Sequence, residues 1–298
     1  MRIYLCPALI DWIVFLVQFA VLYGAGERHM STLECAWLGG VLQIGYMLTS
    51  LGIGFVVTQR NARALLLVGT IGSVGLGATA LHLTGFVALL VTLAVFALFL
   101  SIFFNAFQSF MRRESPPGGL ARTVGAYTVA WSLGGGLGFL SSGYFYRLGA
   151  YVLCAVVLAV GLAVLLILMA YRPRVNDGTA RVDATEAGGA GSRPVNPGYV
   201  ALGWLIIFAA TFVQRPLQTF YPSMSAAAGV SPFMAGLPLF LQMVFQGAAG
   251  AGMIRLRGAL YRRLPFAAVQ ASAAAMLIVA GLCPGPIVAF AVVGLFGV

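Results

Sequence analysis

Two ionisable side chains lie well inside long apolar stretches of the sequence, and they carry opposite charges. Asp11 falls in the stretch from about 4 to 24, and Arg215 falls in the stretch from about 199 to 221. A charge at membrane depth costs about 2.5 to 3.5 kcal/mol on insertion scales, so it usually faces a cavity or a partner. A carboxylate can carry a proton, whereas a guanidinium keeps its charge and suits a carboxylate or a phosphate. Asp11 is therefore a candidate for proton coupling, and Arg215 is a candidate for contact with an anion.

Both side chains also have structural explanations, which stay open. Asp11 could cap the start of its helix after Pro7 or pair with an arginine near the membrane surface, and Arg215 could extend to the interface as a gate residue. At 1.5 Å per residue, Asp11 lies about 10 Å and Arg215 about 24 Å from the side on which their helices begin. A vertical gap of about 14 Å excludes a simple salt bridge, so we predict separate roles.

Neutral polar and aromatic side chains recur at helical spacing in several apolar stretches. Ser101, Asn105, Gln108 and Arg112 fall at i, i+4, i+7 and i+11, on one face of a helix. An amide that faces lipid would lack a partner, so we expect such stripes to point inward, where they line a pore or bond between helices. Aromatic packing is the alternative for the Tyr and Trp side chains. The candidates for contact with a solute are Gln18, Gln43, Tyr46, Asn105, Gln108, Tyr127, Trp131, Gln214, Arg215, Gln218, Gln242 and Gln246.

The elements that must position these residues are stretches of about the length that crosses a bilayer. The 298 residues are 61% hydrophobic and 8% charged, with a mean hydropathy of +0.98, whereas a soluble domain is about 25% charged. Because a span needs about 20 residues of helix, we predict nine complete spans: 4–24, 36–57, 64–85, 86–111, 123–146, 149–171, 199–221, 232–254 and 264–283. A tenth begins at Pro286 and has only 13 residues, which indicates the N-terminal portion of a longer protein.

The arginines indicate how the spans are oriented. All 17 basic residues are arginines, and 14 of them fall on one side if the N-terminus is cytoplasmic. Only Arg28 and Arg147 lie outside. The positive-inside rule therefore predicts a multi-pass protein of the cytoplasmic (inner) membrane with its N-terminus in the cytoplasm. The net charge of +10 follows from this bias and does not indicate nucleic-acid binding.

Motifs for catalysis or metal binding are missing from the sequence. His29 and His82 are the only histidines, and there is no H-E-x-x-H, G-x-S-x-G or nucleotide-binding loop. We therefore expect no enzyme, no metal and no cofactor. The four cysteines lie in or at the ends of apolar helices, where we expect them to pack as small residues without disulfides: Cys6, Cys35, Cys154 and Cys283.

One long polar segment, 172–198, divides the chain and predicts a flexible cytoplasmic linker. The sequences on its two sides match in the same order. Val17 onward aligns with Val213 onward, Gln18 aligns with Gln214, and the turn from Gly54 aligns with a turn from Gly250. The expected domains are 1–171, a six-helix bundle, and 199–298, an incomplete second bundle.

This 6+6 layout resembles the major facilitator superfamily, whose halves rock about a site at the membrane midplane. The segment GFVVTQRNAR, from Gly54 to Arg63, is similar to the family's G-x-x-x-D-R-x-G-R-R turn. Thr58 stands where the family has an acidic residue that helps to latch the cytoplasmic gate, which implies a weakened or rebuilt latch. The gating residues implied are Gly54, Thr58, Arg60, Arg63 and Arg112.

A second segment, GFLSSG at 138–143, resembles the family's G-P-x-x-G-G motif, with Phe139 in place of proline. The glycines around it permit close contact between helices, and we assign Gly134, Gly138 and Gly143 to packing.

The resemblance implies an all-α polytopic membrane protein of the major-facilitator type, with nine complete transmembrane helices and part of a tenth. We expect a monomeric secondary transporter that moves a small solute through the lipid bilayer by alternating access, with proton coupling left open. The alternative is a transporter-like protein that has lost transport and serves as a sensor or assembly partner.

Overall fold

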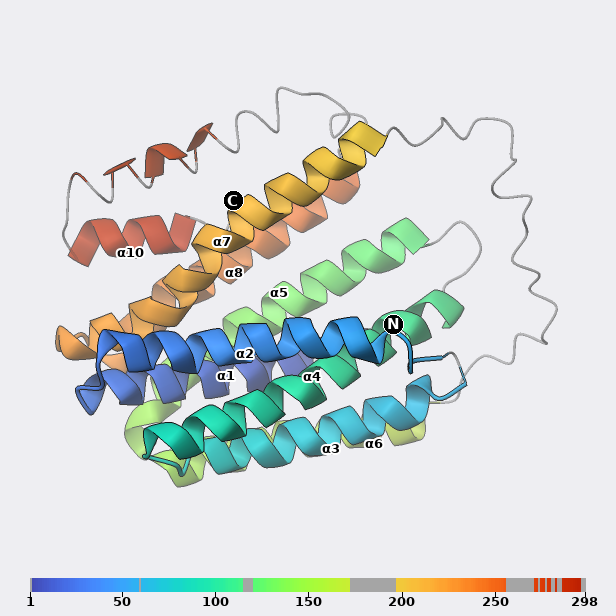
Figure 1. Ribbon diagram of the computed structural model, residues 1–298, viewed down its shortest axis with the longest axis horizontal. Helices are drawn as coiled ribbons and strands as arrows, with labels where there is room; N and C mark the ends of the chain where they lie inside the picture. Colours follow the sequence, from blue (N-terminus) through green and yellow to red (C-terminus); the bar gives the residue numbers. More distant parts are fainter. Residues whose placement is uncertain are drawn as a thin grey trace.

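The computed structural model is a bundle of long helices that lie roughly side by side (Figure 1). It describes residues 2–58, 60–114, 120–171, 197–255 and 286–295, together with eight residues between 271 and 282. The described residues contain no β-strand. The long helices are α1 (Leu5–Glu27), α2 (Thr32–Ile53), α3 (Ala62–Ala80), α4 (Phe86–Glu114), α5 (Leu120–Phe145), α6 (Ala150–Ala170), α7 (Pro197–Ala227), α8 (Pro232–Arg255) and α10 (Pro286–Leu295).

Six of these helices are long and apolar enough to cross a membrane: α1, α2, α3, α4, α6 and α8. The predicted linker 172–198 and the predicted span 264–283 lie largely outside the described residues, so the count of nine spans stays a prediction. Several predicted boundaries differ from the structure, and two of the differences have a clear local cause. Helix α2 begins at Thr32 instead of residue 36, because Ser31 and Glu34 form a capping box. Helix α7 continues past Pro222 to Ala227, since proline is tolerated inside membrane helices.

Four connections form one end of the bundle, which we call the distal end: 28–31, 81–85, 146–149 and 228–231. The N-terminus lies at the opposite end (Figure 1). Helices α2 and α7 lie close together near the distal end and separate toward the N-terminal end. The two ends of the bundle are therefore packed differently.

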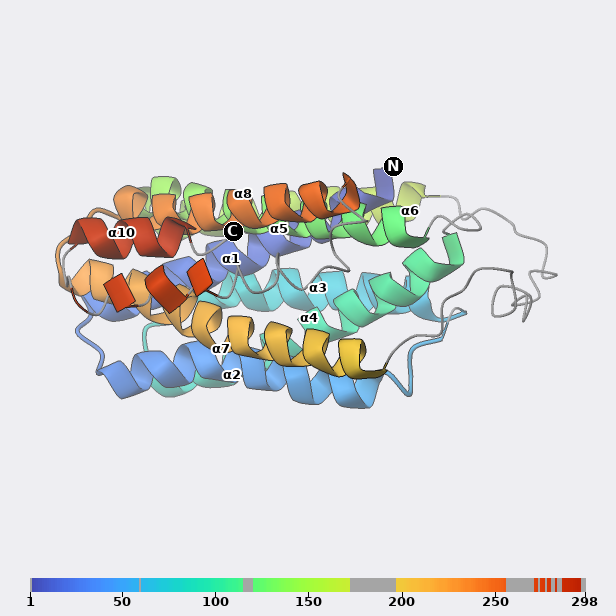
Figure 2. The ribbon, with the colours of Figure 1, turned by 90° about the horizontal axis from the view of Figure 1, so that it is seen from above.

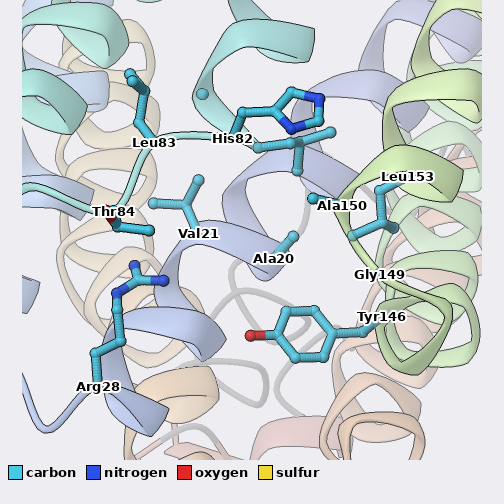
Figure 3. Close-up of a pocket in the computed structure, with 12 residues that line it drawn as sticks. Ala20, Val21, Arg28, His82, Leu83, Thr84, Tyr146, Gly149, Ala150 and Leu153 are labelled. Atoms are coloured by element: carbon cyan, nitrogen blue, oxygen red, sulfur yellow. The ribbon is translucent and has the colours of Figure 1, made fainter.

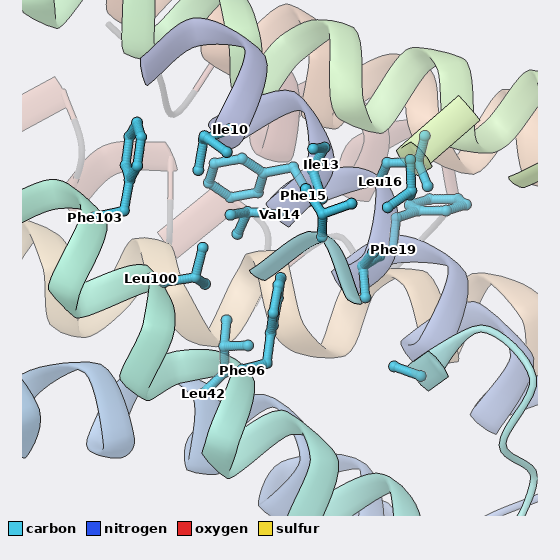
Figure 4. Packing of buried hydrophobic residues seen from close by; sticks show 14 of the residues in the cluster. Ile10, Ile13, Val14, Phe15, Leu16, Phe19, Leu42, Phe96, Leu100 and Phe103 are labelled. Carbon is cyan, nitrogen blue, oxygen red and sulfur yellow. The ribbon is translucent and has the colours of Figure 1, made fainter. Parts of the chain in front are cut away.

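Helix α1 is the centre of the bundle. It passes between α5 and α8 on one side and α2 on the other (Figure 2), and most of its side chains are buried. Phe15 and Phe19 lie within the buried cluster together with Phe96 and Phe103 of α4 (Figure 4). A helix that is apolar all round and buried in this way belongs to the middle of a membrane bundle.

The outer helices expose apolar stripes. On α4, Val87, Val91 and Val95 are exposed one turn apart, and α6 exposes Leu158, Leu162 and Leu166 in the same pattern, among other large apolar residues. Such stripes would promote aggregation in water. In a bilayer they are the surface that faces the acyl chains.

Helices α1 and α5 approach closely through glycines. A Cβ on Gly138 would lie 2.7 Å from the Trp12 carbonyl oxygen, and one on Gly134 would overlap the backbone at Ala8. Phe139, at the position where the related motif has proline, is fully buried and lies 4.9 Å from Phe15 between ring centroids. This segment of α5 therefore packs on α1. Gly143 packs on the start of α8, where its Cβ would lie 2.6 Å from the Pro232 carbonyl oxygen.

Candidate functional site

A cavity of about 180 Å³ lies where five helices meet, and we call it the central cavity. Helix α1 contributes the most residues to its wall, and α2, α4, α5 and α7 contribute the rest. The lining residues are Asp11, Val14, Phe15, Gln18, Leu42, Gln43, Tyr46, Leu100, Phe104, Tyr127, Trp131 and Arg215. Seven of these were predicted from the sequence as coupling or binding candidates. Drug-sized ligand pockets usually hold about 300 to 1,000 Å³, so the central cavity fits only a small ligand.

The two membrane-embedded charges line this same cavity. The sequence-based separation of about 14 Å is therefore wrong, because Asp11 and Arg215 lie close enough to interact electrostatically. Measured instead from the distal ends of their helices, Glu27 for α1 and Ala227 for α7, the depths of Asp11 and Arg215 differ by only about 6 Å. Side chains also tilt toward the N-terminus of a helix, so Arg215 extends toward the level of Asp11.

The first half of the chain leaves polar atoms in the cavity without partners. Asp11 is 2% exposed and Gln18 is 4% exposed. Asp11 Oδ2 has no hydrogen-bond partner among the described residues. Both amide atoms of Gln18 also lack a partner there. A buried polar atom left unpaired costs about 1 to 3 kcal/mol, so a ligand that pairs with these atoms would recover that cost.

The predicted polar residues of α7 and α8 pair with one another instead. Arg215 Nη1 donates to Gln218 Oε1 at 3.1 Å, and Gln218 Nε2 donates to Gln242 Oε1 at 3.1 Å. One turn earlier on α7, Gln214 Nε2 donates to Gln246 Oε1 at 3.4 Å. These four glutamines do not line the central cavity, and the pair at Gln218 holds the Arg215 guanidinium in place.

Ser101 and Asn105 of the predicted stripe on α4 contact α2 and do not line the cavity. Asn105 donates to Ser50 Oγ at 3.1 Å, and the hydroxyl oxygens of Ser50 and Ser101 lie 2.9 Å apart. The α4 residues in the cavity wall are Leu100 and Phe104, one position earlier, which is about 100° around the helix. Apolar wall residues carry no sequence signal that separates them from ordinary core residues.

Two further candidates, Tyr127 and Gln108, contact both protein side chains and open space. Tyr127 lines the cavity and also stacks on Phe107, with ring centroids 5.6 Å apart. Gln108 is exposed and hydrogen bonds to the Tyr127 hydroxyl. Stacking on a ligand and packing between helices are therefore both available to Tyr127.

Two distal turns of the chain, one in each half, have the same geometry. Met30 N–H bonds to the Ala25 carbonyl and Val230 N–H bonds to the Ser225 carbonyl, which completes a Schellman-type helix end in both places. His29 and Gly229 both have positive φ, at 54° and 72°, so these two residues correspond. The sequence-based alignment, which placed Gln18 on Gln214, is therefore wrong at these turns by four positions. Four positions are about one helical turn, so the incorrect alignment still matched residues on the same face.

The corrected alignment changes which residues correspond. Gln18 corresponds to Gln218 instead of Gln214, and Leu42 corresponds to Gln242. Gln218 has the Gln242 amide as its partner, whereas the first half has Leu42, a residue without polar side-chain atoms, in the same cavity wall as Gln18. The first half therefore has no counterpart of the pair between Gln218 and Gln242.

The predicted gating turn forms a local structure at the N-terminal end. Thr58 N–H donates to Asn61 Oδ1 at 2.7 Å, so this hydrogen bond lies inside the turn between α2 and α3. Arg63 Nη2 donates to the Leu168 and Met169 carbonyls, at 3.3 and 3.2 Å, and so caps the end of α6. Arg60 is exposed, and the Arg112 side chain lies outside the description. Gly54 caps the end of α2, but Gly250 lies inside α8, so the predicted second copy of the turn does not begin there.

Helices α5 and α8 of the two halves pack along their length, from Gly143 against Pro232 to Thr128 against Gly250, whereas close contacts of α1 and α2 with α7 lie at the distal end. Gly26 lies against the backbone of Ser223, and Gly39 lies against the Thr219 side chain, so that a Cβ at either position would overlap its neighbour. The Tyr23 hydroxyl donates to the Val230 carbonyl at 2.7 Å. These contacts join α1 and α2 to α7 and α8 and close the distal end.

Apolar helices that are long enough to span a membrane and that surround a polar cavity indicate a multi-pass membrane protein with an internal site. A family model described as the Major Facilitator Superfamily matches residues 3–298, and the chain belongs to this family. Its members are generally not enzymes, and within the described residues no cluster of His, Cys, Asp and Glu could hold a metal ion.

The fold is also similar to a solved structure. That structure is a bacterial homolog of the human lysosomal transporter Spinster, in an inward-facing and unoccupied conformation. The TM-score is 0.55 at 16% sequence identity, and the alignment covers 99% of this chain and 72% of that chain. No curated protein matched the chain.

Proposed function

We propose that this protein is a secondary transporter that moves a small anionic solute together with a proton by alternating access. The observation that carries the proposal is the convergence of Asp11, Gln18 and Arg215 in one cavity between helices of both halves. Arg215 binds the anion, Gln18 adds hydrogen bonds, and Asp11 carries the proton.

The charges of the cavity support coupling between anion and proton. With Asp11 ionised, the Asp11 and Arg215 charges cancel. An anion that enters then leaves a net charge of about −1 in a poorly solvated space, which is costly because charges interact strongly where the effective dielectric constant is low. A proton on Asp11 removes that excess. The loaded state is therefore favoured when anion and proton bind together.

Gln18 narrows the chemistry of the solute. Its amide offers one acceptor oxygen and two donor hydrogens, and neither atom has a protein partner among the described residues. A solute that satisfies both atoms carries a hydrogen-bond donor and an acceptor beside its anionic group. A hydroxy acid or an amino-acid derivative has this combination, and the volume of about 180 Å³ limits its size.

The packing of the bundle supports an inward-facing state for this conformation. The halves contact closely at the distal end through Gly26 and Gly39, whereas α2 and α7 separate toward the N-terminal end (Figure 1). The arginine bias favours a cytoplasmic N-terminus in the inner membrane, so the distal end is the outer one. Alternating access would then require the distal contacts to open.

The test is uptake by proteoliposomes that contain the complete protein, with and without an inward proton gradient. The solutes are a panel of small carboxylates with and without a hydroxyl or amino group. We expect gradient-driven uptake of at least one hydroxylated or amino-substituted acid. Asp11→Asn should abolish the stimulation by the gradient while solute exchange continues, and Glu34→Gln, which changes a carboxylate at the distal end of α2, should leave the stimulation intact.

Two results would overturn the proposal. Unchanged gradient dependence in Asp11→Asn would remove the coupling role of this carboxylate. No flux of any solute, by a protein that remains folded in the membrane, would favour a transporter-like sensor or assembly protein.

A further inference from the structure

A second and larger cavity lies at the distal end, within the first half of the chain (Figure 3). Its volume is about 350 Å³, roughly twice that of the central cavity, and we call it the distal cavity. It lies between the end of α1, the connection after α3 and the start of α6. The lining residues are Ala20, Val21, Arg28, Ala80, Leu81, His82, Leu83, Thr84, Tyr146, Gly149, Ala150 and Leu153.

The polar part of this cavity suits an anion. Arg28, His82, Thr84 and Tyr146 lie in the wall, and no acidic residue does. Figure 3 shows the Arg28 guanidinium extending toward Thr84, with the Tyr146 hydroxyl on the opposite side pointing toward α1. A guanidinium with free donors binds a phosphate through paired hydrogen bonds.

The carboxylate of Glu27, the residue before Arg28, accepts a hydrogen bond from the cavity wall. Tyr146 Oη donates to Glu27 Oε2 at 2.7 Å. Burial raises the pKa of the Tyr146 phenol, and the bond to Glu27 raises it further, so the phenol stays neutral and donates its one hydrogen to Glu27. Among the residues that the structure describes, no carboxylate lies within salt-bridge distance of Arg28. The Arg28 charge is therefore available to a ligand.

A glycine makes room for this arrangement. A Cβ on Gly24 would lie 2.9 Å from the Tyr146 hydroxyl and 3.1 Å from Arg28 Nη1. Gly24 thus lets both side chains lie over the last turns of α1. Any larger residue would displace at least one of them from the cavity.

The apolar part of the cavity distinguishes a lipid from a free anion. Val21 lies two helical turns before Arg28, about 10 Å deeper along α1. With Ala20, Ala80 and Leu153 it forms a wall of small and branched apolar side chains. The basic residues lie at helix ends, at the level of lipid headgroups, and the apolar wall lies at the level where acyl chains begin. Free phosphate could bind only at the part of the cavity that contains Arg28, because the apolar wall offers it no partner.

We propose that the distal cavity binds an anionic phospholipid. Its phosphate contacts Arg28, and the first part of an acyl chain packs against Val21 and Leu153. This site is separate from the central cavity and does not depend on the transported solute. The Arg28 guanidinium offers the phosphate of such a headgroup paired charge-assisted hydrogen bonds.

The test is native mass spectrometry of the complete protein in detergent, titrated with phosphatidylglycerol or phosphatidylcholine. We expect phosphatidylglycerol to bind more tightly and Arg28→Gln to weaken its binding about tenfold, the loss typical of one charge-assisted contact. Arg147→Gln is the matched control, because Arg147 is exposed at the same end and does not line the cavity. Ala150→Phe, which fills the cavity without changing its charge, should also weaken binding.

Three results would overturn the proposal: equal binding of the two lipids, equal losses in Arg28→Gln and Arg147→Gln, or displacement of the lipid by inorganic phosphate at similar concentration. The last would assign the site to a free anion. Because Arg28 is exposed, its substitution should not disturb folding, and unchanged thermal unfolding of Arg28→Gln in detergent checks this.

Discussion

The sharpest prediction concerns Leu42, which stands in the first half where the second half has Gln242, in the same cavity wall as the unpaired Gln18 amide. Replacing Leu42 by glutamine would recreate in the first half the pair that Gln218 and Gln242 form in the second, where the bond is 3.1 Å. The new amide would meet a side chain whose two polar atoms have no partner among the described residues. Leu42→Gln should therefore be tolerated at a buried site, where a polar residue is normally destabilising.

The magnitude follows from the cost of an unpaired buried polar group, about 1 to 3 kcal/mol. Leu38 is the matched control, because it lies one turn earlier on α2, is 1% exposed and does not line the central cavity. Leu38→Gln should lower the unfolding free energy by about 1 to 3 kcal/mol. Leu42→Gln should leave it unchanged or raise it by about 1 kcal/mol, because the new pair offsets the burial of the second amide.

Thermal unfolding of the purified protein in detergent measures this difference without a solute. A double-mutant cycle with Gln18→Leu isolates the pair, since Leu42→Gln should lose its advantage when Gln18 is absent. A Leu42→Gln variant that is destabilised as strongly as Leu38→Gln, with no coupling to Gln18, would refute the correspondence between the halves. If the proposed function is also correct, Leu42→Gln should weaken solute uptake, because the new amide competes for Gln18.

Two further predictions concern glycines. Gly26→Ala should overpack the contact with the α7 backbone at a cost of about 1 to 3 kcal/mol and open the distal end. Cys35 is 3% exposed, and a membrane-impermeant thiol reagent should label it faster in Gly26→Ala than in the Gly40→Ala control. A Cβ on Gly40 has no neighbour within 4 Å. Equal labelling rates would contradict the closed distal end. Gly229→Ala, at φ +72°, should lower the unfolding free energy by about 1 kcal/mol, whereas Gly75→Ala, in open space inside α3, should raise it slightly; equal thermal shifts would contradict this.

The sequence predicted the type of fold well because the constraint is strong. A chain in hydrocarbon must satisfy its backbone polar groups internally, so apolar stretches of about 20 residues become helices. The same constraint singled out Asp11 and Arg215, because a charge is rare and costly at that depth. Both line the central cavity.

The predictions that failed concerned the direction of a polar stripe and the depth of a residue in the membrane, which hydropathy does not determine. The direction of a stripe depends on the neighbour it meets, and Asn105 found Ser50 on α2 instead of the cavity. Depth depends on where a helix begins and ends, and α7 has 31 residues against 23 for α1. A better signal was present in the distal turn, where Ser31 and Glu34 form a capping box and Ser231 also precedes a helix. Aligning those helix starts places Ser31 on Ser231 and gives the correct correspondence directly.

The polar groups are distributed unequally between the halves, and this suggests how work is divided in the site. In the second half, Gln218 receives a hydrogen bond from Arg215 and donates one to Gln242, so the Arg215 guanidinium is held before any ligand arrives. Gln242 Nε2 has no partner among the described residues, but it lies outside the cavity lining. In the first half, Asp11 and Gln18 keep unpaired atoms within the same cavity. Preorganised groups lose little entropy on binding, whereas unpaired buried atoms gain the most from a new partner. If the proposed function is correct, a solute on Arg215 that also pairs with Gln18, with a proton on Asp11, would draw α1 and α7 together around the cavity. Alternating access requires this closure together with the opening of the distal contacts.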